Sequence, residues 1–511
     1  MALGELDLAV LCGYMLLITG IGLYFARKNT NTEEYFVGGR SFSGWIIGLS
    51  LVGTSISSIT FLAYPGDAFK TAWLRFVPNL MLPVGVLIAA IYFLPFFRRG
   101  HITSAYEFLE QRFGASVRVY GAVAFLSGQI VRISMILYLL SLVIHEISGL
   151  DVETCILLGG IFVAFYTIIG GIDAVVWTDV LQTIVLVAGG VACFWIIVDA
   201  LPGGLNQIID VAQTHGKLSF SELREGKLQS APWDFSLHEK TVPMMLLIGL
   251  SAWLTEYSSN QNVIQRYCAS KSNHEARKAM LVCVVSSVPI WAFYMFLGTS
   301  LFVFFQQFPS PSALEMLHGE RPAEQILPFF IMNHMPAGFA GLVIAAALAA
   351  AMSSLDSSIN AISTVWVVDI YRRHLKPNCR DSHYLKVAWL AATVTAVVMI
   401  AGADYLAHSS SKTLQDTATV LASLLAGGML GLYLLGFFTQ MKDATAVWVG
   451  IFCTALFTGW TILSKLRLLP QTLSVPFDLY YTGIIGNLIM FVVSYSVGHW
   501  LRKRLSIGRY V

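Results

Sequence analysis

Long apolar segments dominate the sequence and restrict its fold more than any other feature. About thirteen such segments follow one another: 8–26, 44–64, 73–97, 117–147, 154–170, 175–197, 241–263, 279–305, 337–371, 387–402, 414–438, 444–463 and 477–501. A run of about 20 apolar residues is long enough to cross the hydrocarbon core of a bilayer. Backbone polar groups inside a bilayer must be satisfied within each segment, so we predict an all-α integral membrane protein. Only 12% of the residues are charged, which argues against an ordinary soluble domain.

Basic residues are spread unevenly over the connections, and their distribution predicts the orientation of the chain. Most of the 32 Lys and Arg residues fall in alternate connections, beginning with Arg27 and Lys28 and including Arg266. Cytoplasmic loops carry such an excess, so we expect the N-terminus outside and the C-terminus in the cytoplasm. Because the first basic residues follow segment 8–26, this segment is predicted to be a retained helix and not a signal peptide. We expect a multi-pass protein of the plasma membrane, in particular of a bacterial inner membrane.

Segment 344–369, IAAALAAAMSSLDSSINAISTVWVVD, places a cluster of serines and one aspartate in an apolar helix. A carboxylate there costs roughly 3 kcal/mol on insertion scales, so Asp356 is expected to face a partner, a cavity or an ion. Ala350, Ser353, Ser354 and Ser357 recur at helical spacing and therefore share one face. Serine also permits close helix packing, so two interpretations stay open: a close-packed helix with one buried acid, or one wall of a cation site.

Two segments carry residues that favour an interrupted helix. Segment 44–64 has glycine and small hydroxyl residues before Tyr64-Pro65-Gly66, and unwinding near Gly53 would free carbonyl oxygens for a cation. Segment 241–263 is also polar at mid-span. Five segments lie between the first segment, 8–26, and the external connection 200–240. Five more follow that connection before the last two segments, and an odd number of helices inverts the second copy. We therefore predict a first repeat over 44–197, a second over 241–438, and extra helices at 8–26 and 444–501.

The external connection 200–240 divides these halves and is compatible with either a short amphipathic helix or a plain loop. Seven cysteines show no CxxC spacing, which favours neither a metal site nor a disulfide framework.

Six motifs resemble the sodium:solute symporter family. They are YFVGGRSFSGWIIGLSLVGTSISS (35–58), TSAYEFLEQRFG (103–114), GGIDAVVWTDVLQ (170–182), NQNVIQRY (260–267), SSLDSSINAISTVWVVDIY (353–371) and GGMLGLYLLG (427–436). The resemblance covers nearly the whole chain in the right order. It implies a leucine-transporter-like fold of about 13 transmembrane helices with a five-plus-five inverted repeat, and sodium-driven uptake by alternating access.

The resemblance also implies where sodium would bind. The common sodium site would use the carbonyl oxygens of Gly53, Ile56 and Ala350 and the hydroxyls of Ser353 and Ser354. A hard cation prefers such oxygen ligands. Helix packing alone is the alternative explanation of the same residues.

Some members of the family have a second sodium site, for which the matching residues here are Asp179, Ser353 and Ser357. Asp179 is equally compatible with an interfacial acid that caps the start of a helix. Asp356, between the two serines, departs from the family pattern, in which small or hydroxyl residues are usual. Three roles are open for it: a ligand that strengthens the second sodium site, a group that couples to H+, or one half of an ion pair.

Arg132 is the only basic residue that falls deep inside a predicted span, since Arg75 and Arg118 lie within the first few residues of theirs. Its guanidinium stays charged, so it must face a cavity or an acid. One interpretation is a salt bridge with Asp356, Glu256 or Asp179. The other is a bidentate clamp on a substrate carboxylate, as the resemblance to sialic-acid transporters implies. The further substrate-binding candidates are Ser55, Ser57, Thr60, Asn79, Glu256 and Gln261.

The sequence therefore predicts a Na+-coupled symporter of a small organic solute, with a carboxylate-bearing solute such as sialic acid as the leading candidate. A neutral sugar, a monocarboxylate, iodide or a vitamin are alternatives, and a symporter-like solute sensor is a rival of another class. The short tail after Arg502 leaves no room for the signalling domain that such a sensor would carry. We expect no enzyme activity, no organic cofactor and no nucleic-acid partner. The lipid bilayer, Na+ and the solute are the expected partners, and no oligomer is required.

Overall fold

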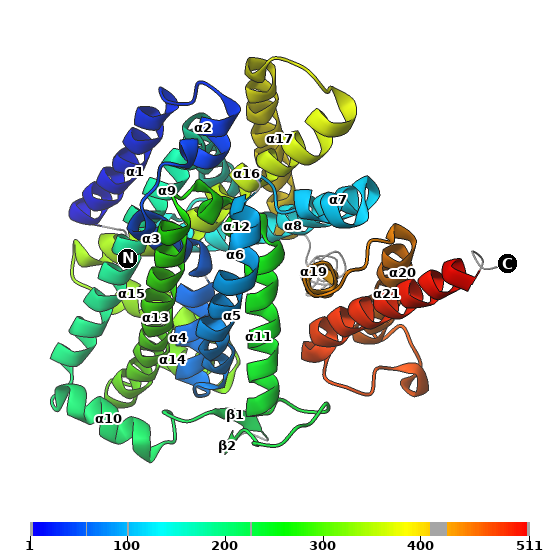
Figure 1. The fold of residues 1–511 in the computed structure, drawn as a ribbon. Helices are drawn as coiled ribbons and strands as arrows, with labels where there is room; N and C mark the ends of the chain where they lie inside the picture. The colour runs from blue at the N-terminus through cyan, green and yellow to red at the C-terminus, as the bar shows by residue number, and fades with distance from the viewer. Residues whose placement is uncertain (1–3, 58, 100–101, 225–226, 409–426, 508–511) are drawn as a thin grey trace.

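The computed structural model describes residues 4–57, 59–99, 102–224, 227–408 and 427–507 and is almost entirely helical (Figure 1). The first half contains α1 (Glu5–Ala26), α2 (Thr32–Val37), α3 (Gly44–Ser55), α4 (Tyr64–Lys70), α5 (Leu82–Ile88), α6 (Leu94–Arg99), α7 (Glu107–Phe113), α8 (Ala115–Ser148) and α9 (Val152–Ala200). The second half contains α11 (Val242–Ser259), α12 (Gln261–Ala269), α13 (Asn273–Gln307), α14 (Pro311–His318), α15 (Ile326–His334), α16 (Phe339–Val365), α17 (Asp381–His408), α19 (Met429–Phe438), α20 (Ala444–Lys465) and α21 (Thr482–Ile507).

Short 3-10 or π-helical turns connect several of these helices. They are η1 (Gly38–Arg40), η2 (Ile59–Ala63), η3 (Leu74–Met81), η4 (Ala89–Phe93), η5 (Ala323–Gln325), η6 (Trp366–Leu375), η7 (Gln471–Leu473) and η8 (Leu479–Tyr481). Together α5, η4, α6 and the preceding η3 make one apolar stretch, Leu74–Arg98, that is long enough to cross a bilayer.

The described residues contain nine helices that are long and apolar enough to cross a membrane, or ten if one bent pair is counted as a span. The predicted number of thirteen is therefore not confirmed. Two features of the helices explain part of the difference between the predicted and the counted spans. Predicted segments 154–170 and 175–197 are joined in α9, and segment 241–263 is divided between α11 and α12. Most of predicted segment 414–438 lies outside the described residues, and only α19 represents it.

Helix α9 runs from Val152 to Ala200 and has a kink at one glycine. Its 49 residues would extend about 74 Å as a straight helix, more than twice the hydrocarbon thickness of a bilayer. Gly171 has φ 58° and ψ −158°, a backbone conformation that an L side chain rarely adopts. The backbone is non-helical there, and the arms before and after Gly171 correspond to the predicted segments 154–170 and 175–197.

Both polar mid-span segments are interrupted where the sequence indicates. Helix α3 ends at Ser55, Ile56 is extended, and the axis turns by 63° before α4. Helix α11 ends at Ser259, and the extended Asn260 separates it from α12 while its side chain accepts a hydrogen bond from the Asn262 amide. Each interruption leaves helix-end carbonyl oxygens without partners inside the helix.

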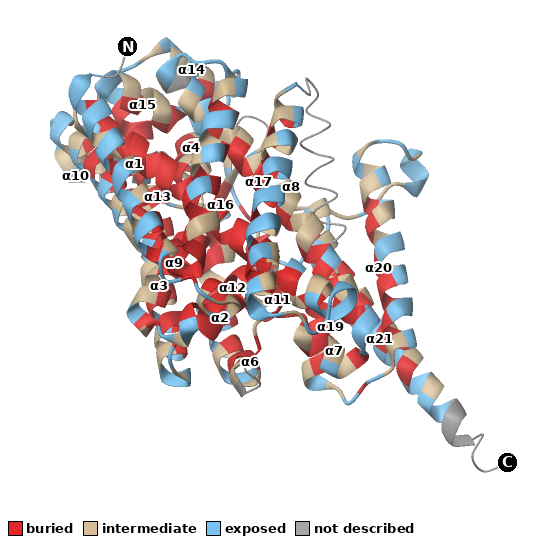
Figure 2. Cartoon of the chain, turned by 90° about the horizontal axis from the view of Figure 1, so that it is seen from above, coloured by how far each residue is buried: buried red, intermediate tan, exposed pale blue. Residues whose placement is uncertain are grey.

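Helix α16 lies at the centre of the bundle and packs against α9, α8, α1 and α17. Nearly all its residues are buried, and Figure 2 shows it surrounded by other helices. Asp7 of α1 binds its first turn, because one carboxylate oxygen accepts hydrogen bonds from the Gly338 and Gly341 amides, both at 2.7 Å. A carboxylate at this end also opposes the positive end of the helix dipole.

The connection 200–240 contains both a helix and a hairpin. Helix α10 (Gly204–Thr214) comes first, and β1 (Ser221–Arg224) then pairs antiparallel with β2 (Lys227–Ser230), with Ser221 opposite Ser230. The predicted alternative of a short helix is therefore confirmed, but it lies upstream of the charged KLSFSELREGKL stretch, which forms the hairpin region.

Candidate sodium and substrate site

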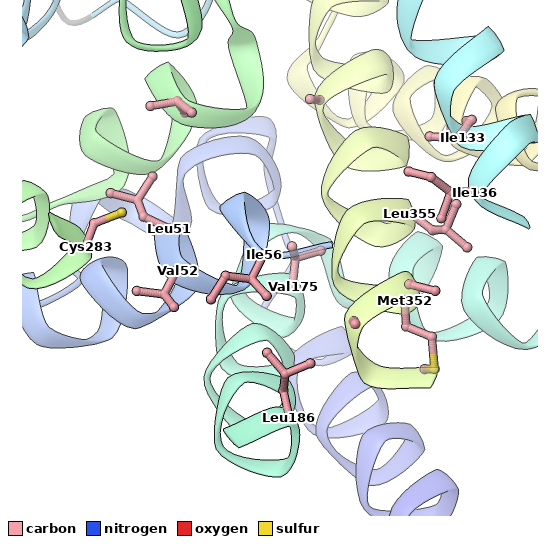
Figure 3. Close-up of a cluster of buried hydrophobic side chains, with 14 of the residues drawn as sticks. Leu51, Val52, Ile56, Ile133, Ile136, Val175, Leu186, Cys283, Met352 and Leu355 are labelled. Carbon is pink, nitrogen blue, oxygen red and sulfur yellow. The ribbon is translucent and has the colours of Figure 1, made fainter. Parts of the chain in front are cut away.

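The serine face of α16 meets the end of α3 at Gly53. A Cβ atom on Gly53 would lie 3.0 Å from the Ser353 hydroxyl oxygen and 3.0 Å from that of Thr183. Contacts this short leave no room for a larger residue, so glycine allows the two helices to approach. Figure 3 shows the surrounding apolar packing, with Ile56, directly after α3, beside Val175 of α9. Two of the predicted sodium ligands, Gly53 of α3 and Ser353 of α16, thus lie close together.

Ser354 has the environment expected of a cation ligand. Its side chain is 2% exposed, and its hydroxyl oxygen has no hydrogen-bond partner among the described residues. A buried polar atom without a partner costs about 1–3 kcal/mol, so it needs another ligand. Ser353 donates its hydroxyl proton to Asp179, which leaves its oxygen lone pairs free to face a cation. Together with carbonyl oxygens at the end of α3, this oxygen-rich donor set suits Na+.

Asp179 is neutralised by a residue that the sequence analysis assigned to a cytoplasmic loop. Arg266 of α12 is 1% exposed, and its Nη2 atom lies 2.7 Å from the Asp179 carboxylate. The same guanidinium donates to the hydroxyls of Ser50, at 2.8 Å, and Ser357, at 2.5 Å. Ser50 also donates to Asp179 at 2.6 Å. The prediction that Arg132 is the only basic residue inside the helical bundle is therefore wrong, because Arg266 is buried there as well.

The Asp356 carboxylate accepts hydrogen bonds mainly from residues outside the Asp179–Arg266 ion pair. Ser357 links the two, because it contacts both Arg266 and Asp356. The Tyr166 hydroxyl donates to Asp356 at 2.9 Å, and the Thr178 hydroxyl lies 3.3 Å from the same carboxylate oxygen. These residues precede and follow the bend at Gly171, so both arms of α9 reach one carboxylate. The other oxygen accepts the Ser357 amide at 2.6 Å. The four predicted ligands of a second sodium site thus lie in one connected network, with Asp179 and Asp356 on opposite sides of Ser357.

Arg132 lies near the middle of α8 and is half-buried. It occurs three residues after Gln129, which accepts a hydrogen bond from Ser358 of α16, so both are on the α8 face that meets α16. The structure shows no hydrogen bond or ion pair for Arg132 within the described part of the chain. Its predicted acidic partners are engaged elsewhere: Asp179 with Arg266, Asp356 with Tyr166, and Glu256 with Asn260 at 2.8 Å.

The other substrate candidates fall into two groups. Ser55, Ser57 and Thr60 lie at the interruption after α3, and Asn79 is linked to that region because its amide donates to the Tyr64 hydroxyl at 2.6 Å. Gln261 is different, since its amide bonds the backbone of Ala105 and Thr103, both at 2.8 Å. Gln261 therefore joins α12 to the segment before α7, away from the interruption of α3.

The segment before α7 makes polar contacts with η6, which continues from the end of α16. Asp369 accepts a hydrogen bond from Ser104 at 2.5 Å and pairs with Arg118 at 2.7 Å. Arg118 also pairs with Glu110, at 2.6 Å. Burial acts to raise the pKa of the Glu110 carboxyl, but hydrogen bonds from Arg118 and Arg373 outweigh it, and the pKa falls below its usual range.

A cavity of about 600 Å³ opens beside the other side of the α3–α4 interruption. Phe61, Leu62 and Ala63 form one wall, and Ile344 and Ala347 of α16 form another. The cavity is mainly apolar, and none of the predicted sodium or substrate residues lines it. It is adjacent to the site, one to two helical turns from Ala350 along α16.

Comparisons with known proteins agree with this geometry. A family model described as the sodium:solute symporter family matches residues 35–453. The sodium/sialic acid symporter SiaT of Proteus mirabilis (strain HI4320) is 32% identical over 96% of this chain and 94% of its own length. The sodium/sialic acid symporter NanT of Aliivibrio fischeri (strain ATCC 700601 / ES114) is 29% identical over 98% and 95%. A solved structure of a substrate-bound, outward-open Na+-coupled sialic acid symporter superposes with a TM-score of 0.87 at 30% identity, covering 96% of each chain.

Proposed function

Because the chain belongs to the sodium:solute symporter family, we propose that it is a Na+-coupled symporter that imports a carboxylate-bearing solute, with sialic acid as the leading candidate. Two observations support sialic acid. Relatives such as SiaT and NanT are sodium/sialic acid symporters, and Arg132 has no ion-pair partner among the described residues. At about 30% identity the substrate does not follow from the relatives alone. The observation that carries the carboxylate is that Arg132, near the middle of α8, has no hydrogen-bond or ion-pair partner among the described residues.

Sodium binds first in this proposal. The carbonyl oxygens of Gly53, Ile56 and Ala350 and the hydroxyls of Ser353 and Ser354 hold the ion between α3 and α16. This ligand set exists only while α3 and α16 are in contact, so Na+ favours the conformation described here over any in which they separate. The difference in sodium affinity between the two conformations drives the transport cycle.

The solute binds next, at the interruption that follows α3. Arg132 provides a charged, planar donor pair that fits a carboxylate bidentately. Ser55, Ser57, Thr60 and Asn79 supply hydroxyl and amide groups that suit the polar groups of a sugar acid. Both carboxylate oxygens of Glu256 accept hydrogen bonds from the Asn260 amide, so in this proposal Glu256 orients the end of α11 and is not a ligand of the solute.

A second sodium ion is also proposed, at the network of Asp179, Ser353, Asp356 and Ser357. Its support is a count of formal charges. The network holds two carboxylates, and the only guanidinium that contacts it within the described residues is that of Arg266. When both carboxylates are ionised, one negative charge is left over in a buried region, and a buried charge is costly unless a cation or a proton balances it.

Uptake into proteoliposomes with an imposed Na+ gradient tests the proposed function. Sialic acids, monocarboxylates, iodide, vitamins and neutral sugars are compared as substrates, with Arg132→Ala alongside the wild type. We expect sodium-dependent uptake of an acid that is lost in the variant. Uptake that does not depend on the Na+ gradient would refute Na+ coupling. Transport of a neutral sugar alone, equal in both proteins, would refute the anion site. Solute binding without any uptake would indicate the rival sensor.

A further inference from the structure

A lysine of the external connection is buried against the end of α4, and no part of the proposed site uses it. Lys217 is 4% exposed. Its Nζ atom donates to the carbonyl oxygens of Phe69, at 2.7 Å, and Thr71, at 2.9 Å. The same atom lies 4.1 Å from the centre of the Phe302 ring on α13. An ammonium has three donors, and two carbonyls and an aromatic face account for all of them.

The local backbone fixes the direction of this side chain. Helix α10 ends with a left-handed Gly216, φ 65°, and the Lys217 amide bonds the carbonyl of Ala212 at 2.8 Å. This arrangement is a Schellman motif, which turns the chain back across the end of its helix. Two residues later the Ser219 carbonyl accepts the Trp73 amide at 2.9 Å, so the external connection holds the α4–η3 turn at two points.

The position of Lys217 matters because α4 is the second half of the interrupted helix. The last carbonyls of a helix lack partners inside the helix, and the Lys217 amine satisfies two of them whether or not it carries its third proton. Any movement of α4 that opens or closes the site must break or carry along these two hydrogen bonds. The rest of the connection does not contact the end of α4 through these ion pairs, since Lys240 pairs with Glu222 and Arg224 with Glu239, all within the connection.

We propose that Lys217 is a positioning residue for the transport cycle, which holds the end of α4 in the conformation that binds Na+ and releases it when the lysine leaves its pocket. The inference rests on the proposed function, in which that conformation carries the sodium site. Lys217 touches neither the ion nor the solute and acts only through α4.

Charged groups around Lys217 do not include a carboxylate partner in the described part of the chain. The titratable and charged groups on the elements packed against it are Asp67 and Lys70 of α4, Arg75 of η3, His215 of its own turn, and Glu222 and Lys240 of the hairpin region. Asp67 is already paired with Arg75 at 2.6 Å. Burial without a counter-ion lowers the pKa of the Lys217 ammonium from 10.5 to about 7.

The sign of the pH effect follows from linkage. A lysine released into water binds its proton up to its ordinary pKa, whereas the buried lysine gives it up near pH 7. The released state therefore holds more protons between these values, and rising pH favours the buried state by up to about tenfold per pH unit. Below pH 7 both states are protonated and the effect disappears.

The test uses purified wild-type protein and three variants, Lys217→Met, Lys217→Arg and Lys227→Met, in proteoliposomes between pH 7.0 and 9.0. Lys227 is an exposed lysine of the same connection and serves as the matched control. We expect the sodium concentration for half-maximal uptake to fall at least threefold with rising pH in the wild type and in Lys227→Met. The fall should vanish in Lys217→Met, and also in Lys217→Arg, because arginine does not titrate in this range. At pH 9.0, Lys217→Met should need about fivefold more sodium, the effect of losing one ordinary hydrogen bond.

Thermal unfolding of the same proteins provides a readout that does not depend on transport. The unfolding midpoint of the wild type should rise relative to that of Lys217→Met as pH increases from 7.0 to 9.0. If this rise occurs but the pH dependence of sodium is the same in all four proteins, Lys217 is only structural and the proposal is overturned. If neither differs, the buried lysine does not titrate as described and the proposal also fails. Loss of all sodium-driven uptake in the wild type would instead refute the proposed function, while the unfolding series would still report on Lys217.

Discussion

Removal of the Ser354 hydroxyl tests whether this group is a sodium ligand or only contributes to helix packing. Ser354→Ala deletes an atom that has no hydrogen-bond partner among the described residues, so the apo protein should lose little stability. If that oxygen binds Na+, one ligand is lost. Its contribution is about 1.5–3 kcal/mol by analogy with hydrogen bonds to charged groups. Sodium affinity should then fall by about 10- to 100-fold, since 1.4 kcal/mol corresponds to a factor of ten.

The matched control is Ser358→Ala, one turn further along α16. Ser358 is also buried, but its hydroxyl proton is shared between Gln129 Oε1, at 3.1 Å, and the Ser354 carbonyl oxygen, at 2.8 Å. This variant removes one shared hydrogen bond and no proposed sodium ligand. It should therefore lower the stability of the apo protein by about 1 kcal/mol and leave sodium affinity almost unchanged.

Sodium-dependent thermal stabilisation measures both effects without transport. At a sodium concentration of 100 times the wild-type dissociation constant, binding stabilises the protein by about 2.7 kcal/mol. A 30-fold weaker site would leave about 0.9 kcal/mol at the same concentration. The wild type, Ser354→Ala and Ser358→Ala are compared with sodium and with choline as the inert cation.

The reasoning is refuted if Ser354→Ala unfolds earlier in choline and keeps the full sodium stabilisation. In that case the hydroxyl would be a packing group with a bound water, and the serine face would be a helix contact. Equal sodium stabilisation in both variants, with uptake intact, would lead to the same conclusion.

The remaining predictions concern the Asp179–Arg266 ion pair, the substrate site, the close helix contact at Gly53 and the second sodium site. Asp179→Asn leaves Arg266 buried without its counter-ion and should cost about 3–5 kcal/mol, whereas the double variant with Arg266→Met should recover much of this loss in the unfolding midpoint. Arg132→Lys should transport an acid at least about tenfold less efficiently, because an ammonium cannot replace a bidentate guanidinium, and initial uptake rates measure this. Gly53→Ala should raise the sodium concentration for half-maximal uptake, because its Cβ would lie 3.0 Å from two hydroxyl oxygens. Asp356→Ser should lower the Hill coefficient for sodium toward one, and an unchanged coefficient above one would place the second ion elsewhere.

Much of the architecture could be predicted because the responsible signals are local. Apolar length identifies spans, and the glycine and hydroxyl residues near Gly53 identify the interruption of α3. Helical spacing alone places Ser353, Ser354 and Ser357 on one face. The number of spans was less accessible, because segment length does not distinguish one bent helix, such as α9 around Gly171, from two separate ones.

Pairings between distant helices could not be predicted in the same way. Arg266 was assigned to a cytoplasmic loop because basic residues near the end of a span usually are there. The interruption at Asn260 instead directs α12 inward, and the guanidinium meets Asp179 from a point 87 residues away in sequence. The polar run from Ser258 to Asn262 was the available signal, since a second interrupted helix can carry a charged residue into the bundle.

By itself, the sequence determined the class of protein, the interruptions and the serine face, because each depends on the composition and period of a single segment. Only the tertiary structure decided which face meets which partner: that Asp179 is neutralised by Arg266, that Asp356 turns to Tyr166, and that Lys217 is buried against α4. The physical reason is that a helical period gives the direction of a side chain relative to its own axis. The partner it meets depends on how separate helices pack, and that is set by the whole bundle.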